Sequence, residues 1–330
     1  MQCTRSVHDM THENSDQNTV DVVVIGGGAG GLAAAVALAR SRRDVVVVDA
    51  GEPRNATADG AHNVLGNEGI PPQELLARGR READSYGARI LAGRATDASG
   101  SLDDFEIEVD DGAQRIRARR VILATGLIDE LPDVPGIAEA WGSTVLHCPF
   151  CHGWEVRDTR IAILARDPNA VHQAMLFRQL SDRVTFIRHE EDALDDDGQR
   201  RLTALEIPVV SARIERVEVD GTRVRALRLA GGERQEVDAV VVAPRFHART
   251  DLYEALGGQA EATAFGQQIP VDERGMTSIP GVWAAGNSSQ PMAMVTGAMA
   301  SGLMAGAAVH GDLAAADLER RLVATATATA

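Results

Sequence analysis

The feature that most constrains the fold is a glycine-rich turn between an apolar strand and an alanine-rich helix. Residues 21–25 read Asp-Val-Val-Val-Ile, which is typical of a strand buried in a parallel sheet. Gly26-Gly-Gly-Ala-Gly-Gly31 follows, and residues 32–40 are rich in the helix formers Ala and Leu. A second apolar run, residues 44–49, ends in Asp49. Together these residues predict one βαβ unit of about 30 residues.

Three glycines of this turn have predicted roles in holding a dinucleotide. Gly26 makes the tight turn, Gly28 lets the backbone approach a pyrophosphate, and Gly31 lets helix and strand pack closely. The helix N-terminus offers free N–H groups, and Asp49 can accept hydrogen bonds from a ribose. The alternative is a glycine-rich turn that binds no ligand. It does not explain why a strand, a helix and an acidic residue accompany the turn in this order.

A divergent second copy of the unit follows in the middle of the chain. Residues 160–165 and 183–187 predict strands, residues 171–180 predict a helix, and the copy ends near residues 240–244. Before it we expect a helix over 72–86, antiparallel strands within 89–120 and a buried strand at 121–124. After it, residues 281–286 return to strand-then-turn character and 297–309 predict a small-residue helix.

The expected fold class is therefore α/β, with two Rossmann-like βαβ domains. The first is discontinuous and takes residues 20–125 and 248–318, and the second is inserted at 126–247. Residues 1–19 are expected to form a disordered polar tail and residues 319–330 a frayed one.

Bulk properties exclude several partners. The net charge of −15 repels nucleic-acid phosphates and anionic membrane surfaces. No run of about 18 apolar residues predicts a membrane span. The N-terminus has no apolar signal core, and a chain with three cysteines is no secreted disulfide scaffold, so we expect a cytoplasmic protein.

Two of the three cysteines form a Cys-Pro-Phe-Cys pair, Cys148 and Cys151, between His147 and His152. This spacing brings two sulfurs within disulfide reach, and the histidines are candidates to stabilise a thiolate or carry its proton. The alternative is half a zinc site, but a second pair is absent and the histidines are too close in sequence for the usual spacing. We therefore predict catalytic Cys148, Cys151, His152 and His147, and no metal.

Two further segments carry a family resemblance together with these motifs. Ala124-Thr125-Gly126 resembles the crossover of two-domain flavoprotein disulfide reductases, and Val282-Trp-Ala-Ala-Gly286-Asn287 resembles their second flavin-contacting strand. From about residue 21 to 313 the chain resembles the low-molecular-weight thioredoxin reductases. The resemblance implies FAD, a homodimer, Cys151 against the flavin and Cys148 facing the substrate. Asn287 replaces an Asp that bonds the flavin ribityl chain, and His152 replaces an Asp that donates a proton.

The Cys-Pro-Phe-Cys-His-Gly run is similar to one sub-branch, the dithiol oxidases that close the disulfides of gliotoxin, holomycin and romidepsin. Residues 51–55 and 243–245 also resemble that branch. By this resemblance the chain would form disulfides in a small molecule rather than reduce them in a protein.

The second glycine loop decides the direction of electron flow. Where the reductases carry Gly-x-Gly-x-x-Ala for NADPH, this chain has Ala165-Arg-Asp167-Pro-Asn-Ala170. At about 5 Å and an effective dielectric near 20, a pyrophosphate charge would be repelled by Asp167 by roughly 3 kcal/mol, about a hundredfold in affinity. The arginine cluster for a 2′-phosphate is also missing, since residues 188–194 keep one arginine and add three acids. Both changes disfavour NADPH.

The sequence therefore predicts an FAD-dependent dithiol oxidase. A small natural-product dithiol would pass electrons through Cys148 and Cys151 to FAD and then to molecular oxygen, giving hydrogen peroxide. Two alternatives stay open, an NAD(P)H-dependent thioredoxin reductase-like enzyme and a degenerate flavoprotein redox sensor. Which dithiol is bound, and which histidine is the acid or base, does not follow from the sequence.

Overall fold

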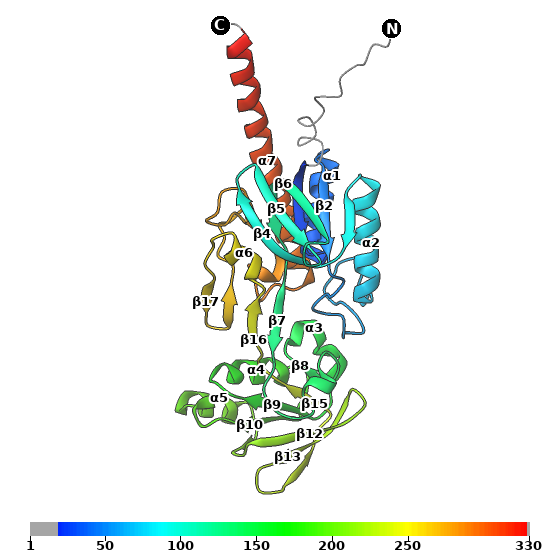
Figure 1. Cartoon of the computed structure of the whole chain (residues 1–330). Helices are drawn as coiled ribbons and strands as arrows, with labels where there is room; N and C mark the ends of the chain where they lie inside the picture. Colours follow the sequence, from blue (N-terminus) through cyan, green and yellow to red (C-terminus); the bar gives the residue numbers. More distant parts are fainter. Residues whose placement is uncertain (1–18, 329–330) are drawn as a thin grey trace, which may run out of the picture.

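The computed structural model describes residues 19–328, which form two α/β domains. Both ends of the chain build one of them, called here the discontinuous domain, and the middle of the chain builds the inserted domain (Figure 1). The α/β fold with two Rossmann-like sheets, predicted from the two βαβ patterns, is confirmed.

The discontinuous domain is built on a seven-stranded sheet in the order β3-β2-β1-β6-β5-β4, with β19 paired to β6. Its strands are β1 (Thr19–Ile25), β2 (Val45–Asp49), β3 (Arg89–Ala92), β4 (Ala95–Ser101), β5 (Asp104–Val109), β6 (Gln114–Leu123) and β19 (Val282–Ala284). The antiparallel strands expected within 89–120 are present as β4, β5 and β6. The strand β3 differs, because it pairs with β2 in parallel and so extends the nucleotide-binding sheet.

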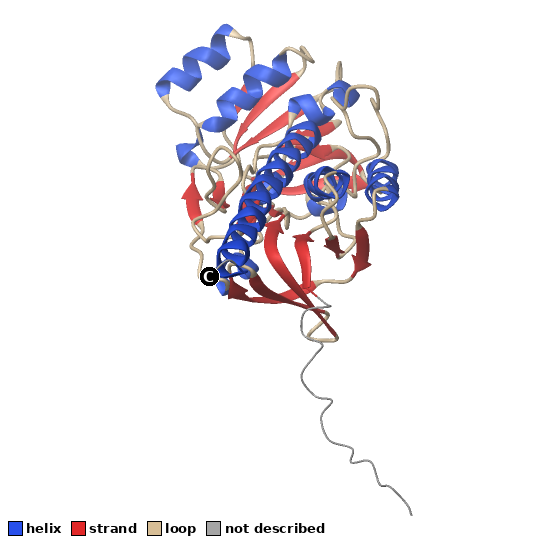
Figure 2. Cartoon of the chain, turned by 90° about the horizontal axis from the view of Figure 1, so that it is seen from above, coloured by secondary structure: helices blue, strands red, loops and turns tan. Residues whose placement is uncertain are grey.

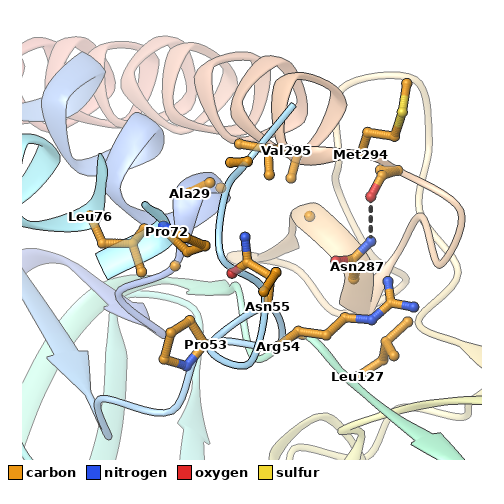
Figure 3. A pocket seen from close by; sticks show the side chains of 18 of the residues that line it. Ala29, Pro53, Arg54, Asn55, Pro72, Leu76, Leu127, Asn287, Met294 and Val295 are labelled. Carbon is orange, nitrogen blue, oxygen red and sulfur yellow. Dashed lines mark hydrogen bonds between the residues drawn. The ribbon is translucent and has the colours of Figure 1, made fainter. Parts of the chain in front are cut away.

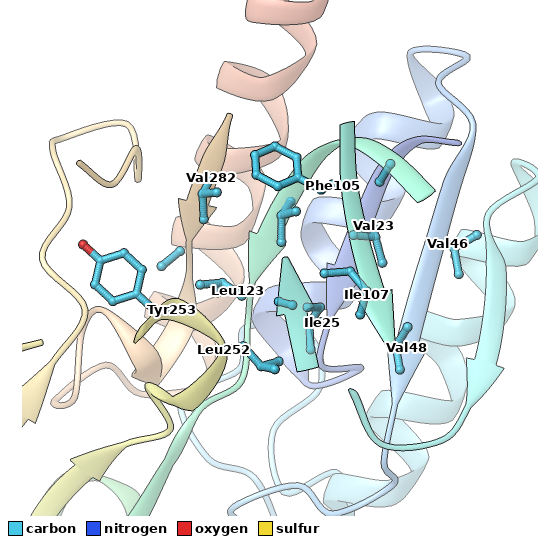
Figure 4. Close-up of a cluster of buried hydrophobic side chains, with 14 of the residues drawn as sticks. Val23, Ile25, Val46, Val48, Phe105, Ile107, Leu123, Leu252, Tyr253 and Val282 are labelled. Carbon is cyan, nitrogen blue, oxygen red and sulfur yellow. The ribbon is translucent and has the colours of Figure 1, made fainter. Parts of the chain in front are cut away.

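Alternate residues of β1 bury opposite faces of this sheet. Val22 and Val24 pack against the helices α1 (Ala29–Arg40) and α7 (Val295–Ala328), and α2 (Pro72–Ser85) flanks α1. Val23 and Ile25 face the β4–β6 meander and pack with Phe105 and other apolar side chains (Figure 4). The strand is therefore apolar throughout because it is covered on both faces.

The helix α7 is longer than predicted. The small-residue pattern predicted a helix over 297–309, whereas α7 covers 34 residues and crosses the sheet in Figure 2. The expectation of a frayed tail from 319 is wrong as far as 328, because Ala and Leu favour the helix and no Gly or Pro interrupts it there. The expected N-terminal tail lies outside the described residues, apart from Thr19, which begins β1.

The inserted domain repeats the βαβ pattern in β9 (Ile161–Ala165), α4 (Asn169–Arg178) and β10 (Val184–Arg188). These strands belong to a parallel sheet in the order β11-β10-β9-β15-β8. Its other members are β8 (Val145–Leu146), β11 (Val209–Val210) and β15 (Ala239–Val241). The helix α5 (Asp196–Ala204) packs beside α4 on one face of this parallel sheet. Its other face is covered by three antiparallel strands, β12 (Ile214–Asp220), β13 (Arg223–Leu229) and β14 (Arg234–Glu236).

The chain passes between the domains through two paired strands, β7 (Leu127–Glu130) and β16 (Arg245–Ala248). They form a small sheet with β17 (Glu261–Thr263) and β18 (Gly266–Gln268). The helix α6 (Asp251–Ala255) lies between β16 and β17 in the chain. Short 3-10 helices cover Ala138–Ala140, Trp154–Val156, Glu191–Ala193 and Gly286–Ser288. The expected domain limit at 125/126 falls just before β7, and the limit at 247/248 falls within β16. Among the described residues, no helix has the length and hydrophobicity to cross a membrane.

Candidate active site

One cavity of about 360 Å³ runs from the glycine turn to the cysteine pair. It is lined by residues from both domains and from the crossing strands. Figure 3 shows the part of its wall that the discontinuous domain and Leu127 of β7 form. The predicted site residues that line it are Gly26, Gly28, Asp49, Ala124, Thr125, Gly126, His147, Cys148, Cys151, His152, Gly286 and Asn287. Gly31 lies behind the lining.

The geometry of the glycine turn fits a pyrophosphate. Gly26 has φ +110°, a conformation that favours glycine, and a Cβ on Gly31 would lie 1.9 Å from the Gly26 carbonyl oxygen. A Cβ on Gly28 would meet no protein atom within 4 Å, so this glycine opens into the cavity. Because α1 begins without a side-chain cap, its first N–H groups stay available to an anion.

Asp49 is already engaged by protein groups. Its Oδ2 accepts hydrogen bonds from Arg80 Nη2 at 2.7 Å and Nε at 3.2 Å, and its Oδ1 accepts from the Gly51 N–H at 3.0 Å. The sequence motif did not reveal Arg80, which comes from α2. A ribose would therefore meet an Asp49 carboxylate that an arginine has oriented.

The Asn287 side chain holds a loop as well as facing the cavity. Its Nδ2 donates toward the carbonyl oxygens of Gln290 (3.2 Å), Pro291 (3.2 Å) and Ala293 (2.8 Å), the last drawn in Figure 3. An aspartate cannot donate to these carbonyls. The amide therefore has a use of its own, beyond replacing the acid that the family resemblance implied.

Replacing Asn287 with Asp should weaken flavin binding rather than improve it. The carboxylate would face three carbonyl oxygens and release residues 290–293 from the cavity wall, at a cost of about 1–3 kcal/mol for the unmade contacts. Flavin dissociation measured by fluorescence, with Asn55→Asp in the same cavity as the control, checks this. Tighter flavin binding in Asn287→Asp would contradict it.

The cysteine pair opens a short helix, α3 (Pro149–His152), that follows β8. Cys148 is the N-cap residue, and its sulfur accepts a hydrogen bond from the Cys151 N–H at 3.3 Å. The two sulfurs are 2.7 Å apart, close enough to interconvert between dithiol and disulfide with little movement. The hydrogen bond from the Cys151 thiol lowers the pKa of Cys148 to about 6, against the opposing effect of burial. The same bond, with burial, raises the pKa of Cys151. In the dithiol state Cys148 is thus the thiolate and Cys151 keeps the proton.

The two predicted histidines differ in how they are held. His147 is fixed by hydrogen-bonding groups around Nδ1 and by an edge-to-face contact with Phe246, with ring centroids 5.5 Å apart. Burial lowers the pKa of His147, which favours the neutral ring at pH 7. The His152 backbone N–H donates to the Cys148 carbonyl oxygen at 3.2 Å, but its ring makes no hydrogen bond to the described residues.

Arg54 is the main cavity residue that motif reasoning did not assign a role. Its Nη2 and Nε donate to the two carboxylate oxygens of Asp129 at 2.6 and 2.8 Å, and its guanidinium lies 5.0 Å from the centre of the Phe246 ring. It extends across the cavity toward Leu127 in Figure 3. Its positive charge also contributes to lowering the pKa of Cys148. Residues 51–55 had been noted only as a family-like segment, and their contact with β7 is not visible in the sequence.

A loop of the discontinuous domain also holds the cysteine turn. Asn63 Nδ2 donates to the Phe150 carbonyl oxygen at 2.6 Å, and the Asn63 carbonyl accepts from Thr296 Oγ1 of α7 at 2.7 Å. His62 lies between Glu68 of its own loop and Glu155 beyond the cysteines. These contacts place the pair at the mouth of the cavity. In residues 19–328, no group of three His, Cys, Asp or Glu side chains is arranged to hold a metal.

Comparison with known proteins agrees with this geometry. The family model described as pyridine nucleotide-disulphide oxidoreductase matches residues 20–302. The chain belongs to this family. The membership predicted from the glycine turn, the crossover and the cysteine pair is confirmed.

Several known proteins are similar to this chain over nearly its whole length. Thioredoxin reductase tcpT of Claviceps purpurea is 32% identical, over 88% of this chain and 94% of its own length. Thioredoxin reductase sirT of Leptosphaeria maculans is 31% identical, over 91% and 96%. The crystal structure of HlmI matches with a TM-score of 0.88 and 42% identity, covering 98% of this chain and 100% of that one.

Membership of this family implies FAD as the cofactor, and the described cavity fits it. The open face of Gly28 and the uncapped start of α1 suit its pyrophosphate, Asp49 suits a ribose, and Asn287 lies further along the wall. The protein is therefore an oxidoreductase of the flavin-dependent disulfide class.

Proposed function

We propose that the protein is a dithiol oxidase, which closes an intramolecular disulfide in a small natural-product dithiol and passes the electrons to molecular oxygen. The observation that carries the proposal lies in the second βαβ unit. Asp167 Oδ1 accepts a hydrogen bond from the Asn169 N–H, the first of α4, at 2.8 Å. A carboxylate therefore lies at the helix N-terminus that would face the pyrophosphate of NADPH.

The segment after β10 supports the same conclusion. His189 is buried, and its Nδ1 accepts a hydrogen bond from the Ile214 N–H at 3.0 Å. It therefore holds β12 instead of presenting a cation to a 2′-phosphate. The replacement of both features of a nicotinamide site supports the entry of electrons from a substrate dithiol at the cysteine pair.

The exchange proceeds through Cys148. A substrate thiolate attacks the Cys148 sulfur of the Cys148–Cys151 disulfide, forming a mixed disulfide and releasing Cys151 as a thiolate. The second substrate thiolate attacks the substrate sulfur of the mixed disulfide, so that the substrate closes and Cys148 leaves as a thiolate. FAD, when bound, supplies the two-electron acceptor that passes electrons on to oxygen. Overall, one dithiol and one O₂ give one disulfide and one H₂O₂.

Stopped-flow absorbance of the flavin tests the proposal against a reductase, the activity named for several relatives. Under anaerobic conditions dithiothreitol should bleach the flavin within the time of a single turnover. NADPH at the same concentration should act at least a hundredfold more slowly, given the roughly 3 kcal/mol repulsion near Asp167. With oxygen present, dithiol consumed and peroxide formed should be equal. Rapid bleaching by NADPH would establish the reductase instead.

We also propose a homodimer in which α7 forms part of the interface. Leu318, Leu322 and Val323 are more than half exposed on a stretch of α7 that extends beyond the body of the domain in Figure 1. Light scattering should give twice the 35.0 kDa chain mass, and Leu318→Glu with Leu322→Glu should give a monomer. Exposed Glu319→Gln on the same helix serves as the control, and a monomeric wild type would refute the proposal.

A further inference from the structure

The neighbourhood of His147 is built to hold one ring nitrogen. His147 Nδ1 lies 3.1 Å from the Val242 carbonyl oxygen, at the end of β15. The Gln173 side chain, from α4, places its Nε2 3.1 Å from the same Nδ1 and 3.3 Å from the carbonyl oxygens of both His147 and Val242. The edge of the Phe246 ring fixes the other side. Three different elements therefore orient one imidazole.

The partners of Nδ1 determine which nitrogen can exchange a proton. The Val242 carbonyl is only an acceptor, so it favours a hydrogen on Nδ1 in both the neutral and the cationic ring. With that hydrogen in place, the two Gln173 Nε2 hydrogens donate to the carbonyl oxygens of His147 and Val242 and not to Nδ1, so the amide holds the backbone against which the ring is placed. Nε2 is then the nitrogen that gains and loses a proton, and it has no hydrogen-bond partner among residues 19–328. His147 lines the same cavity as both cysteines.

Gln173 is itself unusually placed. It is 8% exposed, and its Oε1 is a buried oxygen without a hydrogen-bond partner in the described part of the chain. A buried amide with an unsatisfied oxygen has a cost of about 1–3 kcal/mol. The Nε2 contacts with two backbone carbonyls offset that cost and keep the amide turned toward the histidine. The side chain thus joins the backbone next to Cys148 to the backbone after β15.

Charged groups near His147 do not favour one protonation state strongly. Arg54 disfavours the protonated ring and Asp129 favours it. They are paired with each other at 2.6 and 2.8 Å, so their effects on the ring oppose one another. The remaining titratable groups at this end of the cavity are His62, whose two ring nitrogens face Glu68 and Glu155, and Cys148, Cys151 and His152. The last has no hydrogen bond to hold its ring.

We propose that His147, and not His152, carries the proton during exchange at the cysteine pair, and that Gln173 positions its ring. The proposal rests on the dithiol oxidase activity proposed above. During the closing step, Nε2 of His147 accepts the proton of the thiol that attacks. It then releases this proton to solvent, where the proton of the first thiol went when that thiol entered as a thiolate, and the two protons lost by the dithiol equal the two gained by H₂O₂. The Nδ1–H bond to Val242 stays in place throughout.

The first test reads the tautomer directly. In protein labelled with ¹⁵N-histidine, the NMR signals of His147 should show hydrogen on Nδ1 and a lone pair on Nε2 at pH 8. Gln173→Met keeps the side chain's volume but removes its amide and should give a mixture of tautomers. Gln179→Met, on the exposed end of α4, is the matched control and should leave the signals unchanged. A lone pair on Nδ1 in the wild type, or an unaltered spectrum in Gln173→Met, would overturn the assignment.

The second test is kinetic. With dithiothreitol, His147→Gln should lower kcat by roughly a hundredfold or more, and His152→Gln by much less. Gln173→Met should lower kcat by roughly ten- to a hundredfold with little change in KM and with a shifted pH profile. Retained flavin absorbance shows that each variant is folded. If His152→Gln has the larger effect, His147 is not the proton carrier. A wild type without dithiol turnover would defeat the proposed function, whereas the NMR result would still decide the role of Gln173.

Discussion

Replacing Cys148 or Cys151 with serine should abolish dithiol oxidation while the protein stays yellow. Serine keeps the size and the hydrogen bond between the two positions but cannot form a disulfide, so the step that stores two electrons is lost. Residual turnover should fall below about 10⁻³ of the wild type, as for other residues that act as a unit. Oxygen uptake with dithiothreitol and flavin absorbance in the same sample measure both effects.

The two variants should differ in what they trap. In Cys151→Ser, the Cys148 thiolate can open an acyclic disulfide such as cystamine and remain joined to one half, because the other half leaves and no neighbouring thiol displaces the adduct. Intact-mass spectrometry should therefore find an adduct on Cys151→Ser and none on Cys148→Ser. Cys3→Ser is the control, since Cys3 is the cysteine that does not belong to the Cys-Pro-Phe-Cys pair and lies outside the described residues. Full activity in either variant of the pair would refute the scheme.

Replacing Gly31 with alanine should remove the flavin and destabilise the fold. The added Cβ would lie 1.9 Å from the backbone oxygen of Gly26, so α1 must move away from the turn. Overpacking of this kind costs about 1–3 kcal/mol, and the displaced N–H groups no longer meet the pyrophosphate. We expect a lower unfolding midpoint and a colourless protein after purification.

Gly28→Ala provides a matched comparison. Its Cβ meets no protein atom within 4 Å, and its φ of −75° suits alanine. The flavin-free stability should be unchanged, while flavin affinity falls because the methyl group enters the space for the phosphates. Comparing the two variants thus distinguishes the effect of helix packing from the effect of contact with the flavin phosphates. If Gly31→Ala purified with full flavin and wild-type stability, the packing role assigned to this glycine would be wrong.

Much of the fold and of the candidate site could be predicted from local sequence motifs. Strand β1, the glycine turn and α1 are continuous in sequence, so their order alone predicts the fold of that unit. The cysteine pair and the second βαβ unit could be predicted from the sequence for the same reason. A single apolar run cannot show its partner, however, and β3 was assigned to the meander when it extends the parallel sheet.

What the sequence could not predict is the contact between distant segments. Arg54 and Asp129 are 75 residues apart, and Asn63 reaches a carbonyl 87 residues away. Neither pair has a spacing that any motif describes. Similarly, Asn287 was read as a substitution at one flavin contact, and only the loop that folds back over it gives the amide its three carbonyl partners.

The packing of α7 on α1 has a consequence for biosynthesis. A Cβ on Gly302 of α7 would lie 1.9 Å from the Gly30 carbonyl oxygen of α1, so the two helices touch backbone to backbone. One lies near the start of the chain and the other at its end. On the ribosome, the inserted domain emerges complete while the flavin-binding domain still lacks this helix. The cofactor site is therefore complete only after α7 has been synthesised, and a chain that stops before α7 presents the glycine turn without its closing partner.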